Sequence, residues 1–244
     1  MALVGIYSFP KSGNTWIRGI VSALMDENGS AIPDLHRDQL SDAKEYKGFR
    51  FFKHHAGRDI KVWKAQTLDT THVIHIRRNP LDVFVSYMNY ISENVTNSAD
   101  IPFESAEAIS GTELFDLYFH SFIVMGHVDP SFVGMTGDYF RHNRYWLSHT
   151  GKTMAYLRYE DLMNKPVAAL GFLKDWLGVD DEDIQIACDK AAASTTKNGK
   201  FYWRQQEKNY FNFLTDEQVA LFLKYRGDEC RKLGYDPEYL AHRP

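Results

Sequence analysis

The stretch GIYSFPKSGNTWIR, from Gly5 to Arg18, decides the fold that this sequence predicts. The apolar run from Leu3 to Phe9 predicts a short buried strand, and apolar residues at helical spacing follow from Thr15 to Met25. A Pro-Lys-Ser-Gly turn therefore joins a strand to the start of a helix. Such a turn presents several backbone N–H groups at one point, where the helix dipole adds partial positive charge. The sequence thus predicts a binding site for a phosphate group.

The polar side chains of this turn fit the same interpretation. Lys11 adds a full positive charge, and Ser12, Asn14 and Thr15 add hydrogen-bond donors next to Gly13. These donors also suit capping of the helix, a role that is compatible with phosphate binding. In the P-loop of nucleotide kinases, G-x-x-x-x-G-K-[ST], the lysine follows the last glycine. Here the lysine precedes the glycine, which disfavours a kinase of that type.

The 244-residue length and the composition, 44% hydrophobic and 25% charged, predict a single domain over residues 1–244. The net charge of -4 and the lack of a long basic run argue against a nucleic acid as the main partner. No stretch reaches the roughly 18 apolar residues of a membrane span. We therefore expect a soluble, cytoplasmic protein without a membrane partner. No metal is expected, because His72, His75 and the other histidines lack a carboxylate or cysteine set at ligand spacing.

Strands and helices alternate along the rest of the chain. Strands are expected at 49–53, 71–76 and 153–158, and helices at 81–90, 166–178 and 180–193. A candidate helix at 104–124 lies in a region of weaker pattern, and a capping box from Thr215 to Gln218 opens the last helix. Strands that alternate with helices predict an α/β fold, in which helices flank a central parallel sheet.

Four segments resemble the family of sulfotransferases that use 3′-phosphoadenosine 5′-phosphosulfate (PAPS). The order Pro-Lys-Ser-Gly-x-Thr-Trp is similar to the phosphosulfate-binding loop of that family. IHIRRNPLDVFVSY (residues 74–87) resembles its second signature, in which a strand ends in Arg-Asn-Pro before a helix. FFKHHAG (51–57) resembles the family's Lys-x-His segment, and LRYEDL (157–162) resembles a further family segment. The resemblance spans residues 4 to about 178, and the matches keep the family's order, which argues against coincidence.

The resemblance implies a P-loop-like three-layer fold and the family's reaction. In that reaction a sulfuryl group passes in line from PAPS to a hydroxyl or amine of a small-molecule acceptor. The product 3′-phosphoadenosine 5′-phosphate (PAP) leaves, and no metal is required. A small-molecule kinase stays an alternative, although no clear carboxylate follows a strand to hold its Mg²⁺. A nucleotide-binding module without catalysis is the other alternative, and the acceptor and the oligomeric state stay open.

The resemblance also assigns residues to the cofactor. Arg78 and Ser86 match the pair that holds the 3′-phosphate, Trp16 matches the residue that stacks on adenine, and Tyr159 matches one that lies near the adenine. Lys11 is placed to stabilise the charge that grows on the leaving phosphate, and Ser86 restrains Lys11 until an acceptor arrives. Core packing is the alternative role for Trp16 and Tyr159, and a surface position is the alternative for Arg78.

His55 is the predicted general base, because the acceptor must lose a proton and histidine suits that task at neutral pH. By the same resemblance, Lys53 stabilises charge on the transferring group. Strand side chains alternate between faces, so Lys53 and His55 are expected on one face and His54 on the other. His54 stays the alternative base, and a structural role stays the alternative for His55.

The C-terminal part departs from the family pattern. Members usually carry an Arg-Lys-Gly segment followed by Gly-Asp-Trp-Lys-Asn, whereas residues 197–215 read KNGKFYWRQQEKNYFNFLT. Lys200 or Arg204 is expected to take over the contact to the 3′-phosphate, and Ser194 or Thr195 to meet the adenine or phosphate edge. The region 91–137 is the expected acceptor wall, where aromatic side chains line a pocket or, as the alternative, pack the core.

Overall fold

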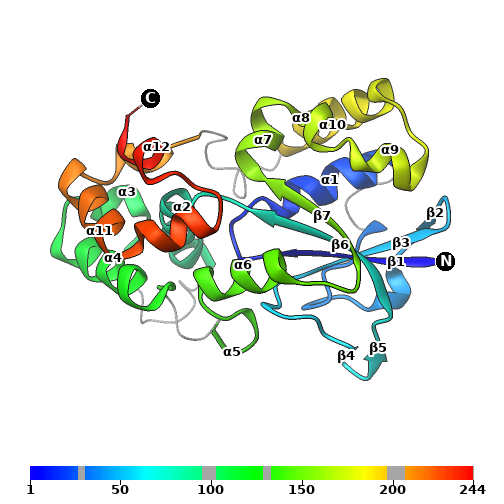
Figure 1. Ribbon diagram of the computed structural model, residues 1–244, viewed down its shortest axis with the longest axis horizontal. Coiled ribbons are helices and arrows are strands. Elements are labelled where there is room, and N and C mark those ends of the chain that lie inside the picture. Colours follow the sequence, from blue (N-terminus) through cyan, green and yellow to red (C-terminus); the bar gives the residue numbers. More distant parts are fainter. Residues whose placement is uncertain (27–30, 95–102, 129–132, 197–206, 244) are drawn as a thin grey trace. The chain divides into compact units, whose positions relative to one another are not determined.

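The computed structural model of the protein describes residues 1–26, 31–94, 103–128, 133–196 and 207–243, and Figure 1 shows its helices and strands. The chain divides into two compact units. The first unit comprises Met1–Arg78 and Tyr145–Gln205, and the second comprises Asn79–Arg144 and Gln206–Pro244. The single domain predicted for residues 1–244 stays a prediction. No helix of the described ranges is long and apolar enough to cross a membrane.

A five-stranded sheet with the order β2-β3-β1-β6-β7 forms the centre of the first unit (Figure 1). Its strands are β1 (Ala2–Ser8), β2 (Glu45–Tyr46), β3 (Phe49–His54), β6 (Thr70–Arg77) and β7 (Thr153–Arg158). All neighbours pair in parallel except β2, which runs antiparallel to β3 at the edge. The predicted strands in β1, β3, β6 and β7 are confirmed to within one residue at each end.

Helices of the first unit cover one face of this sheet (Figure 1). They are α1 (Asn14–Leu24), α7 (Tyr159–Asn164), α8 (Pro166–Ala169), α9 (Phe172–Leu177) and α10 (Asp181–Thr196). Because strand side chains alternate, Ile6 of β1, Phe51 of β3 and Ile74 of β6 share a buried core with these helices. The predicted helix at 166–178 is two helices, since i→i+3 hydrogen bonds around Leu170 and Gly171 interrupt it.

The other face of the sheet packs against the C-terminal end of α6 (Tyr139–Ser148). The Trp146 ring stacks on the Tyr7 ring of β1 with centroids 4.2 Å apart, and its indole N–H donates to the carbonyl of Ala56 at 2.9 Å. Helix, sheet and helix thus form three layers. The predicted α/β fold with a central, mostly parallel sheet is confirmed.

A small hairpin, a 3₁₀ turn and the edge strand β2 were not predicted from the sequence. The hairpin consists of β4 (Val62–Trp63) and β5 (Gln66–Thr67), and the 3₁₀ turn η2 spans Leu40–Asp42. Lys64 and Ala65 make the hairpin turn with positive φ values of 45° and 62°. Asn-Gly or Asp-Gly usually occupies such turns, so the sequence carries no signal for this one.

The second unit consists of helices around an aromatic core. They are α2 (Pro80–Asn94), α3 (Ala106–Ile109), α4 (Glu113–Met125), α5 (Val133–Thr136), η4 (Asn209–Asn212), α11 (Asp216–Lys232) and α12 (Pro237–Ala241). The predicted helix at 104–124 is two helices, because Gly111 adopts a φ of 78° and Thr112 caps the start of α4. The capping box predicted from Thr215 to Gln218 is confirmed.

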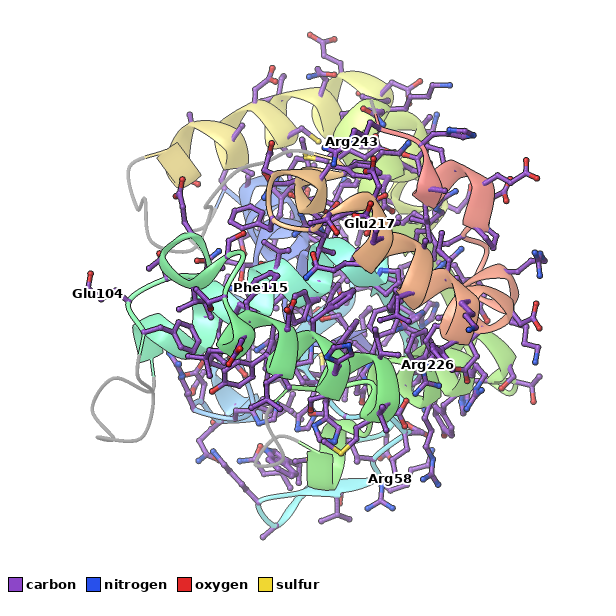
Figure 2. The ribbon with its side chains drawn as sticks, turned by 90° about the vertical axis from the view of Figure 1, so that its left-hand side faces the viewer. Arg58, Glu104, Phe115, Glu217, Arg226 and Arg243 are labelled. Atoms are coloured by element: carbon purple, nitrogen blue, oxygen red, sulfur yellow. The ribbon has the colours of Figure 1, made fainter. Side chains whose placement is uncertain are left out.

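The aromatic residues expected in the acceptor wall belong to this core. Phe103, Phe115, Phe119 and Phe122 are buried, as the core-packing alternative predicts, Tyr118 is half-buried against Phe103, and Phe132 lies outside the described residues. Arg226 of α11 donates to the carbonyls of residues 123 and 124 at the end of α4 and lies over the ring of Phe140, 4.7 Å from its centroid (Figure 2). The guanidinium thereby satisfies carbonyl groups that have no partner within their own helix.

One buried carboxylate joins the start of α2 to the segment around η4. Asp82 is 2% exposed, and its two oxygens accept the backbone N–H groups of Lys208 and Tyr210 at 3.0 Å each. The amide of Asn79 donates to the same carboxylate at 2.6 Å. Because three donors bind this buried carboxylate, Asp82 fixes residues 208–210 within the second unit.

We expect Gly5→Ala to destabilise the protein. A Cβ atom at Gly5 would lie 2.3 Å from Cε2 of Tyr7, whose ring crosses over the glycine in the middle of β1. The ring must shift, which disturbs its stack on Trp146 and costs about 1–3 kcal/mol in the free energy of unfolding. Gly19→Ala in α1 is the matched control, because its Cβ meets only Ala191 at 3.6 Å and alanine favours a helix. Denaturant unfolding in which Gly5→Ala is as stable as the parent would contradict this packing.

Candidate active site

The turn between β1 and α1 has an unusual backbone conformation. Lys11 adopts a φ of 67° and Gly13 a φ of 102°, both in the left-handed region. Lysine rarely takes this conformation, which costs about 1–3 kcal/mol and persists only where the surrounding structure imposes it. Residues with positive φ turn consecutive N–H groups toward one point and so form a concave site for anions.

The start of α1 points into this turn without a side-chain cap. Gly13 is the N-cap residue and makes no capping hydrogen bond, so the first N–H groups of the helix are not satisfied in that way. Ser12 is fully buried, and its hydroxyl has no hydrogen-bond partner among the described residues. Buried hydroxyl groups are normally paired, so this one fits a bound anion. The phosphate site around Lys11, Ser12 and Gly13 stays a prediction, and the conformation of the turn is compatible with it.

The other two polar residues of the turn have different positions. Asn14 is buried, and its amide donates to the Ser8 hydroxyl at 3.1 Å and to the Ile6 carbonyl at 3.4 Å. Thr15 is exposed at the start of the helix. Asn14 therefore connects the end of β1 to the first turn of α1, while the Thr15 side chain faces away from the core.

Three of the predicted cofactor residues pack together beside the turn. The Tyr159 ring lies against Gly13, where an added Cβ would be 2.5 Å from Cδ2 of the tyrosine. Arg78 follows β6 directly, and its guanidinium lies 4.3 Å from the centroid of the Tyr159 ring. Trp16 meets the same tyrosine edge to face at 5.8 Å. Because Trp16 is only 8% exposed and belongs to the hydrophobic core, little of its ring is open to a ligand.

Lys53 and the two histidines lie at the end of β3, next to the end of β1. Ile6 and Tyr7 of β1 pair with Lys53 and His54 in the parallel register. His54 is fully buried, its Nδ1 accepts the N–H of Ala56 at 2.9 Å, and its ring stacks on His36 with centroids 4.3 Å apart. These contacts are typical of a structural histidine, and the choice between His54 and His55 as the base stays a prediction.

His55 follows the last residue of β3, so the alternation of strand side chains does not extend to it. Its Nδ1 lies 2.8 Å from the carbonyl oxygen of Ser8 and 3.5 Å from the Ser8 hydroxyl. A carbonyl oxygen can only accept a hydrogen bond, so Nδ1 carries the proton in this contact. His55 thus lies beside the residue that precedes the turn, and Asn14 holds the same serine from the other side.

Three residues near the site were missed from the sequence. Ser8 contacts His55, Asp34 forms an ion pair with Lys53 at 2.7 Å, and His36 accepts the backbone N–H of His55 at 3.3 Å. Ser8 stands next to the turn in the sequence, and that neighbourhood was the only available signal. Asp34 and His36 approach β3 through tertiary structure, which no spacing rule predicts.

The structure does not test the position of the other predicted site residues relative to the turn. Ser86 lies half-buried on α2, in the second unit. Ser194 is exposed on α10, and its hydroxyl donates to the carbonyl of Ala191 at 2.8 Å. Lys200 and Arg204 lie outside the described residues. Within those residues no cluster of three or more His, Cys, Asp or Glu side chains is arranged to hold a metal ion.

Comparison with known proteins identifies the family. A model of the sulfotransferase domain matches residues 4–224. Mouse (Mus musculus) sulfotransferase 6B1 is 26% identical over an alignment 244 residues long. The alignment covers 91% of this chain and 74% of the relative. The chain therefore belongs to the sulfotransferase family, and the PAPS-dependent enzyme class predicted from the sequence is confirmed at the level of that family.

Solved structures share the fold. Mouse sulfotransferase SULT7A1, complexed with PAP, has a TM-score of 0.67 and 18% identity, and the match covers 99% of this chain and 89% of that one. Retinol dehydratase, in complex with androsterone and inactive cofactor PAP, has a TM-score of 0.62 and 15% identity, with 94% and 80% of the two chains covered. At these identities the likeness supports the three-layer fold described above.

We expect Gly13→Ala to weaken nucleotide binding, with PAP as the probe. The alanine would have to adopt a φ of 102°, and its Cβ would collide with the Tyr159 ring. The turn would then change shape, which weakens calorimetric binding of PAP by about tenfold or more, or 1.4 kcal/mol. Gly48→Ala is the matched control, because Gly48 has a φ of 82° and no neighbour within 4 Å. The control should lose stability and keep its affinity for PAP, and equal affinities for both variants would refute the role of the turn.

Proposed function

We propose that this protein transfers a sulfuryl group from PAPS to a hydroxyl or amine group of a small-molecule acceptor and releases PAP. The observation that carries the proposal is the turn with positive φ at Lys11 and Gly13, which opens an uncapped helix beside the buried, unpaired hydroxyl of Ser12. Family membership supports PAPS as the donor, and the related structures hold PAP.

The turn binds the 5′-phosphate side of the donor in this proposal. Backbone N–H groups and Lys11 stabilise the charge that grows on the leaving phosphate as the sulfur–oxygen bond breaks. Arg78 binds the 3′-phosphate, because its planar guanidinium can donate two parallel hydrogen bonds, and Ser86 is its proposed partner. The Tyr159 ring packs against Gly13 and the Arg78 guanidinium. These contacts favour a second role for Tyr159, in which it holds both residues in place, in addition to the proposed contact with adenine.

His55 acts as the general base. Because Nδ1 donates to the Ser8 carbonyl, the imidazole tautomer leaves Nε2 without a proton, as a base requires. As the acceptor attacks sulfur, its proton moves to Nε2, the new oxygen–sulfur or nitrogen–sulfur bond forms, and the bond to the phosphate oxygen breaks. The Ser8 carbonyl stabilises the imidazolium that results. His54 is the weaker candidate, because its Nδ1 already accepts a backbone N–H and its ring is fully buried.

The alternatives have less support. A kinase of the P-loop type would need the lysine after the glycine, and the order here is the reverse. A nucleotide-binding module without catalysis would not need a histidine oriented by the Ser8 carbonyl next to a buried lysine. The acceptor stays open, although the androsterone in the retinol dehydratase complex favours a small molecule over a polymer. The expected cytoplasmic location is part of this proposal.

His55→Ala should abolish transfer and leave PAP binding intact. Loss of a general base lowers turnover by about 10²- to 10⁴-fold, whereas the phosphate contacts do not involve the imidazole. A mass-spectrometric screen of hydroxyl and amine acceptors with PAPS detects the gain of one sulfonate group, and calorimetry measures PAP. His54→Asn is the matched control, because the amide oxygen can still accept the N–H of Ala56. Turnover that survives in His55→Ala and disappears in His54→Asn would transfer the role to His54.

A further inference from the structure

The segment 33–35 runs beside the end of β3 as an additional short pairing. Lys53 donates its N–H to the carbonyl of Pro33 at 2.9 Å, and Leu35 donates to the carbonyl of Lys53 at 3.1 Å. Asp34 and Lys53 form an isolated parallel bridge between these bonds. The two backbones therefore hold the aspartate and the lysine side by side, independently of their charges.

The side chains of this pair meet in a largely buried place. Lys53 Nζ lies 2.7 Å from Asp34 Oδ2, and the two side chains are 10% and 16% exposed. The other oxygen of Asp34 accepts the N–H of His36 at 3.2 Å, and the Asp34 N–H donates to a carboxylate oxygen of Asp38 at 2.8 Å. The bond from the His36 N–H and the contact with Lys53 orient the Asp34 carboxylate, and the bond to Asp38 holds the backbone of the loop.

Two positive charges and one negative charge among the described residues act on Lys53. Arg18 of α1 and Arg37 of the segment after Asp34 both act on the lysine, and Asp34 is the anion that faces it. Burial lowers the pKa of Lys53, the two arginines lower it further, and Asp34 opposes both effects. His36 faces the pair as well, and burial followed by the charge of Lys53 lowers its pKa. Without Asp34, the buried Lys53 ammonium would lose the anion that offsets the charges of Arg18 and Arg37.

We propose that Asp34 is a positioning residue for sulfuryl transfer: it keeps the Lys53 ammonium charged and directs it at the end of β3. The inference rests on the proposed function, in which Lys53 stabilises charge on the transferring group. A neutral amine would not stabilise that charge, so the carboxylate determines up to which pH the lysine contributes. Nothing in the pattern of the Lys-x-His segment assigns this task to a residue 19 positions upstream.

The pH dependence of turnover tests the proposal. Lys53 is charged below its pKa, so its contribution is present at lower pH and is lost as the pH rises through that value. In Asp34→Asn the opposing charge is gone, and the alkaline limb of the kcat profile should move down by about one to three pH units. Asp38→Asn is the matched control, because it removes a carboxylate from the same loop while its amide oxygen can still accept the Asp34 N–H, and the alkaline limb of its profile should stay in place.

The same substitution in a Lys53→Arg protein distinguishes an electrostatic role of Asp34 from a structural one. Arginine keeps its charge whatever its neighbours are, so Asp34→Asn combined with Lys53→Arg should show no shift relative to Lys53→Arg alone. A merely structural role for Asp34 would lower turnover in both backgrounds without moving the limb in either. Asp34→Glu retains a carboxylate and should restore most of the alkaline limb, which also covers the case that Asp34→Asn fails to fold.

A measurement that does not depend on catalysis tests the role of Asp34 separately from the proposed function. Peptide mass spectrometry measures the rate of Lys53 acetylation as a function of pH. The midpoint of this profile should lie at lower pH in Asp34→Asn than in Asp38→Asn, and the shift should be smaller in Asp34→Glu. If wild-type protein binds PAP but transfers no sulfonate group, the proposed function is overturned. A shift in the acetylation midpoint of the Asp34 variants would still support the effect of Asp34 on Lys53. Equal acetylation midpoints and equal alkaline limbs in the Asp34 and Asp38 variants would overturn the role of Asp34.

Discussion

The backbone of residues 9–13 has to connect a buried strand to a buried helix within one turn, and it does so with positive φ at Lys11 and Gly13. Nothing in the local sequence except the glycine favours this conformation, so packing on both sides must impose it. The core residues of β1 and α1 belong to one cluster, and the Tyr159 ring occupies the space behind Gly13. Backbone with positive φ turns N–H groups toward one point. In the proposed function, the donor phosphate binds at that point, and the proposed base His55 contacts Ser8 just before the turn.

Burial of charge is the second constraint on this site. A cation that stabilises a transferring group acts more strongly away from water, but water no longer stabilises the cation itself. The structure meets this cost with a specific partner for each of two cations. Asp34 faces Lys53 at 2.7 Å, and the ring of Tyr159 lies beneath the Arg78 guanidinium. The tyrosine therefore connects the turn between β1 and α1 to the arginine, whereas the family resemblance associates it with adenine.

Local chemistry made part of this structure predictable from the sequence. The strand, turn and helix around Lys11 depend on residues that are neighbours in the chain, and so does the capping box at Thr215. The hairpin at Lys64 and Ala65 has no turn signal, and the ion pair of Asp34 with Lys53 depends on a backbone pairing across tertiary structure. Asp82 holds Tyr210 across 128 positions, which no local pattern indicates. The residues that position the site were thus harder to predict than those that are proposed to bind the cofactor.

A crystal structure of the protein with PAP tests the central claim most directly. The account predicts that the 5′-phosphate oxygens lie within hydrogen-bond distance of N–H groups in residues 11–15 and of the Ser12 hydroxyl. It also predicts that Lys11 keeps its positive φ, because the turn is formed before the ligand binds. A 5′-phosphate bound elsewhere, with the turn between β1 and α1 making no contact to the nucleotide, would contradict the account.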